Sequence, residues 1–173
     1  MSKDVFLSNF NCIYKCTLNS KLRDFQFRLL HNAVITNTRL RQWGIVEDEN
    51  CTFCRRSPES ILHLLIECHY STQLGNSLFD YIEEIAGISI KPTKAEFFLG
   101  ILDGDLSHFY NNIMIIGKQY IYASRCLNKK PCFQVLIQKI RLEMKLQYLI
   151  AIQNEKLDLW KRKWSLLDQI TFM

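Results

Sequence analysis

Three cysteines and one histidine lie close together in the stretch CTFCRRSPESILHLLIECH at residues 51–69. Cys51 and Cys54 are separated by two residues, and His63 and Cys68 follow after a charged loop that contains a proline. Thiolates and imidazoles are the ligands that Zn²⁺ prefers in proteins, and it takes four of them in a tetrahedron. The spacing therefore predicts a zinc site with Cys51, Cys54, His63 and Cys68 as its ligands.

The predicted zinc ion is structural, because four protein ligands leave no position for an activated water. His69 is an alternative fourth ligand, although side chains as close as those of His69 and Cys68 cannot easily both face one ion. A Cys-x-x-Cys pair can also be a redox-active dithiol, and clustered cysteines can simply be buried. The redox interpretation requires a strand that leads into a helix, and it leaves His63 unexplained. Burial alone conflicts with the charged loop at residues 55–59, which is expected on the surface.

The composition is that of a globular protein. The chain has 173 residues, of which 48% are hydrophobic, and this is enough to bury a core. No stretch reaches the roughly 18 apolar residues of a membrane span, and the start MSKDVFLSNF lacks the pattern of a signal peptide. Seven cysteines, an odd number, fit a reducing compartment better than a set of disulfides. We therefore expect an intracellular protein of the cytoplasm or nucleus, with no membrane partner.

Two helices are predicted before the cysteines, because apolar residues return at spacings of three and four. The first covers residues 20–32 and begins at Ser20, which can cap it. The second covers residues 36–43 and ends before Gly44, which can adopt the left-handed conformation. Trp43 is expected to pack in the core. Together the two helices form a helical hairpin.

The same spacing predicts a helical remainder and no strands. Pro58 can begin a helix because proline at the first helical position loses no needed N–H. The segment GISIKPTK, with its glycine and its proline, is a connector. It predicts a boundary between residues 1–88, the hairpin with the zinc module, and residues 93–173, a helical subdomain with a long basic helix. The predicted helices are 58–68, 71–86, 93–101, 106–127 and 132–164. The fold class is thus mainly α: a helical hairpin, a small CCHC zinc-bound loop and helix, and a long-helix hairpin.

Positive charge is unevenly distributed along the chain. The net charge is +5, but residues 129–163 alone carry nine Lys and Arg against three acidic residues, a net charge of +6. Such a segment favours a polyanionic partner, although a solvated helix face looks similar. The candidate nucleic-acid contacts are Lys21, Arg23, Arg28, Arg39, Arg41, Arg55, Arg56, Lys161, Arg162 and Lys163.

The run KLRDFQFRLLHNAVITNTRLRQWGIVEDENCTFCRRSPESILHLLIECHYS resembles the zinc-binding region that follows the polymerase domain in reverse transcriptases of non-LTR (LINE-type) retrotransposons. The likeness covers about residues 20–82 closely and the remainder, with FFLGI, GKQYIYASR and a late tryptophan, more loosely. The family often has proline after the last cysteine, where this chain has His69. The resemblance implies a role in gripping template RNA or target DNA during target-primed reverse transcription, with the polymerase domain of a full-length protein as a further partner.

Catalytic signatures are absent from the sequence. An aromatic-x-Asp-Asp motif for two-metal nucleotidyl transfer, a Gly-rich phosphate loop and a GxSxG motif do not occur. We therefore expect a non-catalytic nucleic-acid-binding module without a small-molecule substrate. In this hypothesis zinc pins the loop with Arg55 and Arg56 against the basic helix that bears Lys21, Arg23 and Arg28. Two alternatives stay open: a structural or protein-interaction module that braces a polymerase or a partner helix, and a remnant without activity.

Overall fold

The computed structural model describes residues 16–87, 89, 91–101 and 106–164, except for the side chains of Ala86 and Arg162. Within this part of the chain the structure is helical and has no strand, which confirms the predicted mainly α fold. In chain order the elements are α2 (Ser20–Leu30), α3 (Asn37–Gln42), the π-helix η1 (His63–Glu67), α4 (His69–Ala86), α5 (Lys94–Leu99), α6 (Ser107–Cys126), α7 (Phe133–Gln153) and α8 (Leu157–Trp164).

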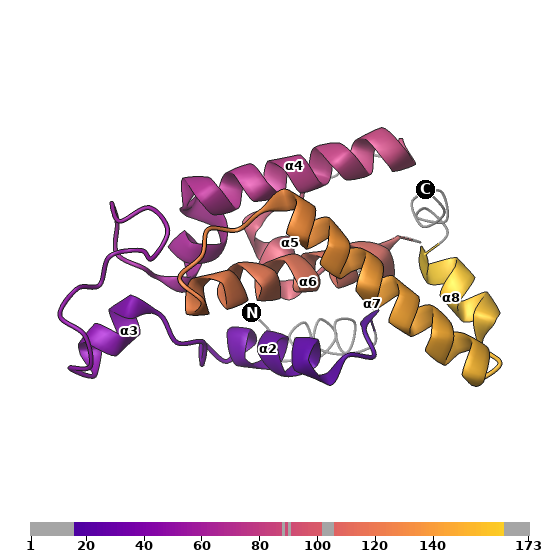
Figure 1. The fold of residues 1–173 in the computed structure, drawn as a ribbon, viewed down its shortest axis with the longest axis horizontal. Helices are drawn as coiled ribbons and strands as arrows, with labels where there is room; N and C mark the ends of the chain where they lie inside the picture. The colour runs from indigo at the N-terminus through magenta and orange to yellow at the C-terminus, as the bar shows by residue number, and fades with distance from the viewer. Residues whose placement is uncertain (1–15, 88, 90, 102–105, 165–173) are drawn as a thin grey trace.

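Helix α6 lies at the centre of the molecule (Figure 1). It packs against α2, η1, α7 and α8, and most of its side chains are buried, including the polar Asn112 and Lys118. Figure 1 shows α4 and α2 on opposite sides of α6, with α7 crossing in front. One hydrophobic core joins elements before and after the connector, and the division into 1–88 and 93–173 stays a prediction. No helix among the described residues is long and apolar enough to cross a membrane.

Two helices, α2 and α5, begin with a side-chain cap, and the first of these is shifted by one residue from the prediction. The side chain of Asn19 accepts a hydrogen bond from the backbone N–H of Lys21 at 3.0 Å, so Asn19 caps α2 and Ser20 is its first residue. Helix α5 begins with a full capping box, in which Thr93 and Glu96 each accept from the other's backbone N–H.

The predicted long helix at residues 132–164 is broken in the structure. Helix α7 ends at Gln153, Glu155 adopts a left-handed conformation with φ of 55°, and α8 turns back to pack on α7. The apolar spacing continues across the break and gives no warning of it. Folding back nevertheless buries Trp160 and Trp164, which are only 8% and 1% exposed, and this burial favours the break over a continuous helix.

Two further sequence predictions are wrong. The helix predicted from Pro58 begins only at Ile61, because Pro58 instead forms an isolated antiparallel bridge with Asn50. Trp43 is not in the core: it is 55% exposed, and the guanidinium of Arg39 lies 5.9 Å from its ring centroid. A short helix such as α3 has little core to offer a side chain of this size.

Candidate metal centre

A tight turn places Cys51 and Cys54 side by side. The bridge between Asn50 and Pro58 closes the loop at its base, and the backbone N–H of Arg55 donates to the carbonyl of Cys51 at 2.9 Å. Arg55 has a φ of 58°, in the left-handed region that favours glycine. The backbone thus accepts local strain directly after the second cysteine so that the chain can turn around the two thiols.

The π-helix brings His63 and Cys68 to the same side of the backbone. In an α-helix, residues five apart point roughly 140° away from each other, because each residue turns the helix by about 100°. In η1 the backbone N–H of Cys68 donates to the carbonyl of His63 at 2.7 Å, which is the hydrogen-bond spacing of a π-helix. This wider turn lets both side chains face Cys51 and Cys54.

The four predicted ligands come together in the structure. Their donor atoms, one from each residue, all lie within 4.8 Å of one another. The Sγ atoms of Cys51 and Cys68 are 3.8 Å apart, and Sγ of Cys54 is 3.3 Å from Nε2 of His63. With Zn–S bonds of about 2.3 Å, two sulfurs of a tetrahedral site are about 3.8 Å apart. The donor set and its spacing therefore fit a zinc ion.

His69 lies outside this cluster. It is exposed, and its ring stacks on that of Tyr70 with 3.9 Å between centroids. Cys68, directly before it, is fully buried. The structure thus groups His63, and not His69, with the three cysteines.

The thiols differ strongly in acidity. Burial raises the pKa of Cys51 to about 12 and also raises the pKa of Cys68. For Cys54, burial raises the pKa, but the backbone N–H of Arg56 and a hydrogen bond with His63 outweigh it, so the pKa falls to about 7. Because a thiolate is the form that binds metal, zinc must displace protons from the two buried thiols, and binding is expected to weaken at low pH.

A buried carboxylate anchors the metal loop, which is the turn at residues 50–58 that carries Cys51 and Cys54, to the helices. Glu59, which the sequence suggested was on the surface, has no exposed area. Its Oε2 accepts from the backbone N–H of Thr52 at 2.6 Å, and its Oε1 accepts from the backbone N–H of Asn37 at 3.1 Å. Arg125 of α6 donates to the same Oε1 through Nε at 2.8 Å.

Asn37 completes this network. Its Oδ1 accepts from Nη2 of Arg125 at 2.6 Å, and its Nδ2 donates to the carbonyl of Asn50 at 2.8 Å. The metal loop, the start of α3 and the end of α6 are thereby joined through Glu59. Sequence reasoning missed Glu59, Arg125 and Asn37, because no local pattern connects residues so far apart in the chain.

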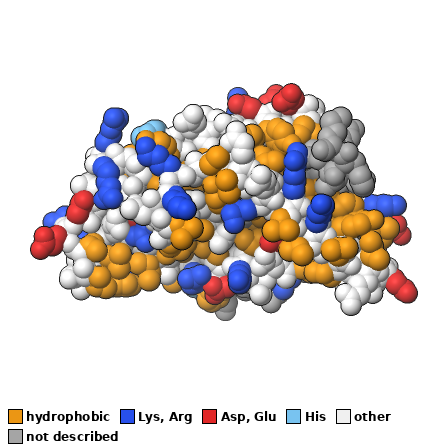
Figure 2. Space-filling model, in the orientation of Figure 1, with side chains coloured by type: hydrophobic (Ala, Val, Ile, Leu, Met, Phe, Trp, Pro, Cys, Tyr) orange, Lys and Arg blue, Asp and Glu red, His pale blue; other side chains and the backbone are white. Residues whose placement is uncertain are grey.

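The candidate nucleic-acid contacts do not form a single cluster. Arg39, Arg41, Arg55 and Arg56 belong to α3 and the metal loop at one end of the molecule, whereas Lys161 and Lys163 lie on α8 at the other end (Figure 1). Figure 2 shows lysines and arginines scattered among apolar side chains across one face. Several are already engaged: Arg41 pairs with Glu49 at 3.1 Å, Arg39 donates to the carbonyl of Asn32, and Nε of Arg23 donates to the carbonyl of Thr17 at 2.7 Å. The side chain of Arg162 lies outside the described part of the structure.

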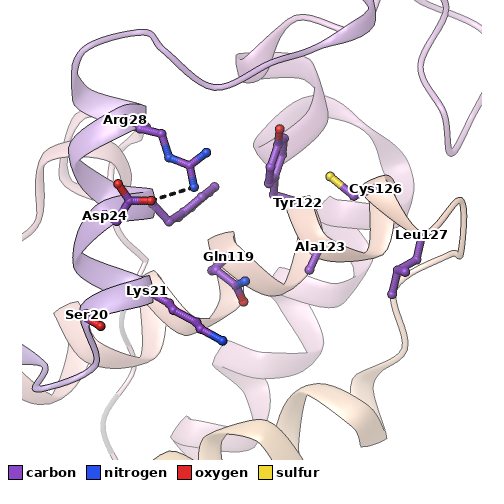
Figure 3. A pocket seen from close by; sticks show the side chains of 10 residues that line it. Ser20, Lys21, Asp24, Arg28, Gln119, Tyr122, Ala123, Cys126 and Leu127 are labelled. Carbon is purple, nitrogen blue, oxygen red and sulfur yellow. Dashed lines mark ion pairs between the residues drawn. The ribbon is translucent and has the colours of Figure 1, made fainter.

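Lys21 and Arg28 face an open hollow between α2 and α6 (Figure 3). The hollow has a volume of about 670 Å³. Figure 3 shows these cations on α2 across from Tyr122 on α6, with Arg28 paired to Asp24 at 2.9 Å. The ring of Tyr122 is partly exposed and lies 5.5 Å from that of Phe25. The residues that line the hollow are Ser20, Lys21, Asp24, Phe25, Arg28, Gln119, Tyr122, Ala123, Cys126 and Leu127.

A comparison with known protein families gives a match in the N-terminal part of the chain. Residues 2–74 match the family model described as zinc-binding in reverse transcriptase. The matched segment contains α2, α3, η1 and all four clustered ligands, whereas α5 to α8 lie beyond it. No curated protein matches the sequence.

Proposed function

We propose that this chain is a non-catalytic nucleic-acid-binding module of a reverse transcriptase, stabilised by one structural zinc ion that Cys51, Cys54, His63 and Cys68 hold. The observation that carries the proposal is the approach of these four ligand atoms to within 4.8 Å, inside the segment that matches a reverse-transcriptase zinc-binding family. Bound zinc supplies folding energy by tying the turn to η1. The resemblance to non-LTR elements further favours template RNA or target DNA as the ligand.

The hollow between α2 and α6 supports single-stranded nucleic acid as the ligand. Proteins that bind single strands combine cations for phosphate with aromatic rings on which bases stack. Lys21 and Arg28 supply the cations, and the partly exposed ring of Tyr122 supplies the aromatic surface. Asp24 offsets part of this charge, so binding requires further cations.

The metal loop supplies additional positive charge, and a bound zinc ion would hold this charge in place. Arg55 and Arg56 follow Cys54 directly, so zinc binding fixes the backbone from which they project. Arg55 is 60% exposed, and Asp48, at 3.9 Å, is a distant ion-pair partner. Phosphate contacts carry no base information, so weak sequence specificity and a strong dependence on salt are expected.

A binding assay with unrelated single-stranded RNA and DNA oligonucleotides tests the proposal. In fluorescence anisotropy, Lys21→Ala with Arg28→Ala and Arg55→Ala with Arg56→Ala should each weaken binding about tenfold for every sequence and reduce the salt slope. Lys91→Ala, an exposed lysine of the connector, is the matched control and should bind as the unmodified chain does. Unchanged affinity in both double variants at low salt contradicts the assignment of these residues.

A further inference from the structure

The outer face of α7 is apolar although the helix buries its opposite face. Val135, Leu142, Leu146 and Leu149 are 40%, 57%, 45% and 60% exposed. Figure 2 shows apolar side chains among cations on the face that α7 crosses. The buried side of the same helix consists of Leu136, Ile140, Met144, Gln147 and Ala151. The exposed residues are therefore not needed for the internal core.

The spacing of these residues is that of a helix-binding seam. Val135, Leu142 and Leu149 repeat every seven residues, and Leu146 lies four after one leucine and three before the next. From Leu142 to Leu149 this is the alternation that lets the side chains of one helix interlock with those of another, whereas Lys139 takes the position four after Val135. α7 thus presents one apolar seam to its own core and a second seam outward.

A hollow lies between α7 and α8, beside Ile150, which directly follows the seam residue Leu149; Gln147 and Ala151 of the buried side of α7 also line it. It has a volume of about 270 Å³, and the partly exposed Leu18, Ile150 and Leu159 contribute to its apolar lining. Two other lining residues carry buried donors, Nε2 of Gln147 and Nε1 of Trp160, that have no hydrogen-bond partner within the described structure. A large side chain from a partner would fill this hollow, and an acceptor oxygen beside it would meet a need that the chain leaves unmet.

The border of this surface is cationic. Lys145 is exposed on α7, and Lys156 and Lys163 line the hollow. Glu143, the acidic residue of α7, already accepts a hydrogen bond from Nδ2 of Asn19. A second copy of the chain is disfavoured as the partner, because it would bring like charges together. Nucleic acid is disfavoured too, because leucine side chains cannot bind phosphate. Charge complementarity instead selects an apolar surface with acidic edges.

We propose that the outer seam of α7, together with the hollow between α7 and α8, docks an amphipathic helix of a partner protein that carries leucine-type residues along its apolar face and acidic residues along its borders. The seam buries the apolar residues of that helix, the hollow receives an anchoring side chain, and the lysines set its orientation. This interaction does not depend on the nucleic-acid proposal, because it uses neither the metal loop nor the hollow between α2 and α6.

The test uses the full zinc-loaded chain and two designed helical peptides, each about four heptads long with leucine at the core positions. One peptide has glutamate at the flanking positions, and the matched peptide has lysine there. In fluorescence anisotropy the glutamate peptide should bind at least about tenfold more tightly than the lysine peptide. The variant Leu146→Glu with Leu149→Glu should weaken this binding at least about tenfold. Ile45→Glu, at a residue that is 63% exposed beside α3, is the control and should bind normally.

Three results would overturn the proposal. The first is equal binding of the glutamate peptide to the chain and to the double variant, and the second is no binding of that peptide at all. The third is a concentration-dependent dimer, seen by sedimentation, that the double substitution abolishes, since it would mean that a second copy occupies the seam. Circular dichroism of the variants should match that of the unmodified chain, because both leucines are exposed.

Discussion

At the scale of single residues, the backbone decides which side chains can share an ion. His63 and His69 are both histidines close to Cys68, and composition does not separate them. The π-turn that begins at His63 rotates Cys68 toward it, whereas His69 starts α4 and lies exposed against Tyr70. The spacing in the sequence identified the group of four, but the wide turn that makes a five-residue separation workable is visible only in the structure.

The two histidines therefore give a matched pair of substitutions. His63→Ala should abolish tight, stoichiometric zinc binding, because the site loses the imidazole that lies 3.3 Å from Sγ of Cys54. His69→Ala should retain one zinc per chain. Metal content after dialysis, measured by mass spectrometry of the native protein, distinguishes them. Loss of zinc in the His69 variant with retention in the His63 variant would reverse the ligand assignment.

Lys118 gives a pH dependence that belongs to one residue. Its Nζ donates to the carbonyl of Phe97 at 2.8 Å, and burial lowers its pKa from 10.5 to about 7. Between those two values the unfolded chain binds more protons, so this residue makes the free energy of unfolding rise with pH across that window. Below about pH 7 the ammonium of Lys118 is charged in the folded chain as well, and the free energy of unfolding is then lowered by the full cost of burying this charge.

Lys118→Met should remove this rise. The variant also loses the hydrogen bond to Phe97, but that loss is the same at every pH. We compare the free energy of unfolding of the variant with that of the unmodified chain at each pH. The difference, variant minus unmodified chain, should be larger at pH 7 than at pH 10 by more than about 1 kcal/mol. Urea unfolding with excess zinc measures it, and Lys145→Met, at an exposed position, should show no such change. A difference that does not vary with pH would mean that Lys118 titrates normally.

At the scale of elements, the junction between the metal loop and α6 rests on a buried ion pair. Glu59 and Arg125 have side chains that are 0% and 11% exposed, and Asn37 joins both to the start of α3. The proline before Glu59 suggested a helix start on the surface, because Pro58 fits that position locally. The bridge between Pro58 and Asn50 forms in place of that helix start. It points Glu59 inward, where two backbone N–H groups and Arg125 donate hydrogen bonds to its carboxylate.

Breaking this pair should cost far more than breaking an exposed one. Arg125→Met leaves the buried carboxylate of Glu59 uncompensated and should lower the free energy of unfolding by about 3–5 kcal/mol. Arg28→Met removes an arginine from an ion pair whose side chains are 45% and 61% exposed, and it should cost less than about 1 kcal/mol. Chemical denaturation of both variants tests the contrast. Equal costs would show that the Glu59 network does not hold the loop to α6.

Helix identity was predictable from the sequence to a greater extent than helix ends. The spacing of three and four located α4 and α6 to within about two residues, because both bury long apolar faces. The same spacing wrongly predicted one continuous helix across Glu155. The left-handed turn at Glu155 depends on burying Trp160 and Trp164 against α7. Local periodicity describes one helix at a time, and so it does not register a reversal that only a second helix stabilises.

At the scale of the whole molecule, α6 connects the metal loop to the C-terminal helices. Its last turn carries Arg125 and so depends on the loop, and the helix also packs against α7 and α8, with the ring of Phe109 6.1 Å from that of Trp164. Tyr148 and Trp160 pack edge to face at 4.9 Å, and Trp164 donates to Gln147 at 3.3 Å, all within α7 and α8. These contacts do not involve the metal ligands. Zinc should therefore stabilise the molecule unevenly.

Removing zinc should expose this gradient in hydrogen exchange. With the ion chelated, three buried or half-buried thiols and His63 lose their common partner, and residues 50–68 should lose amide protection first. The loss should extend through Glu59 to α3 and the last turn of α6, while α7 and α8 keep slow exchange because their mutual burial is unchanged. Exchange followed by mass spectrometry, with zinc added back as the control, measures each segment. Uniform loss over all helices would mean that the ion is required for the entire core, and no loss near Cys51 would mean that the loop is held without it.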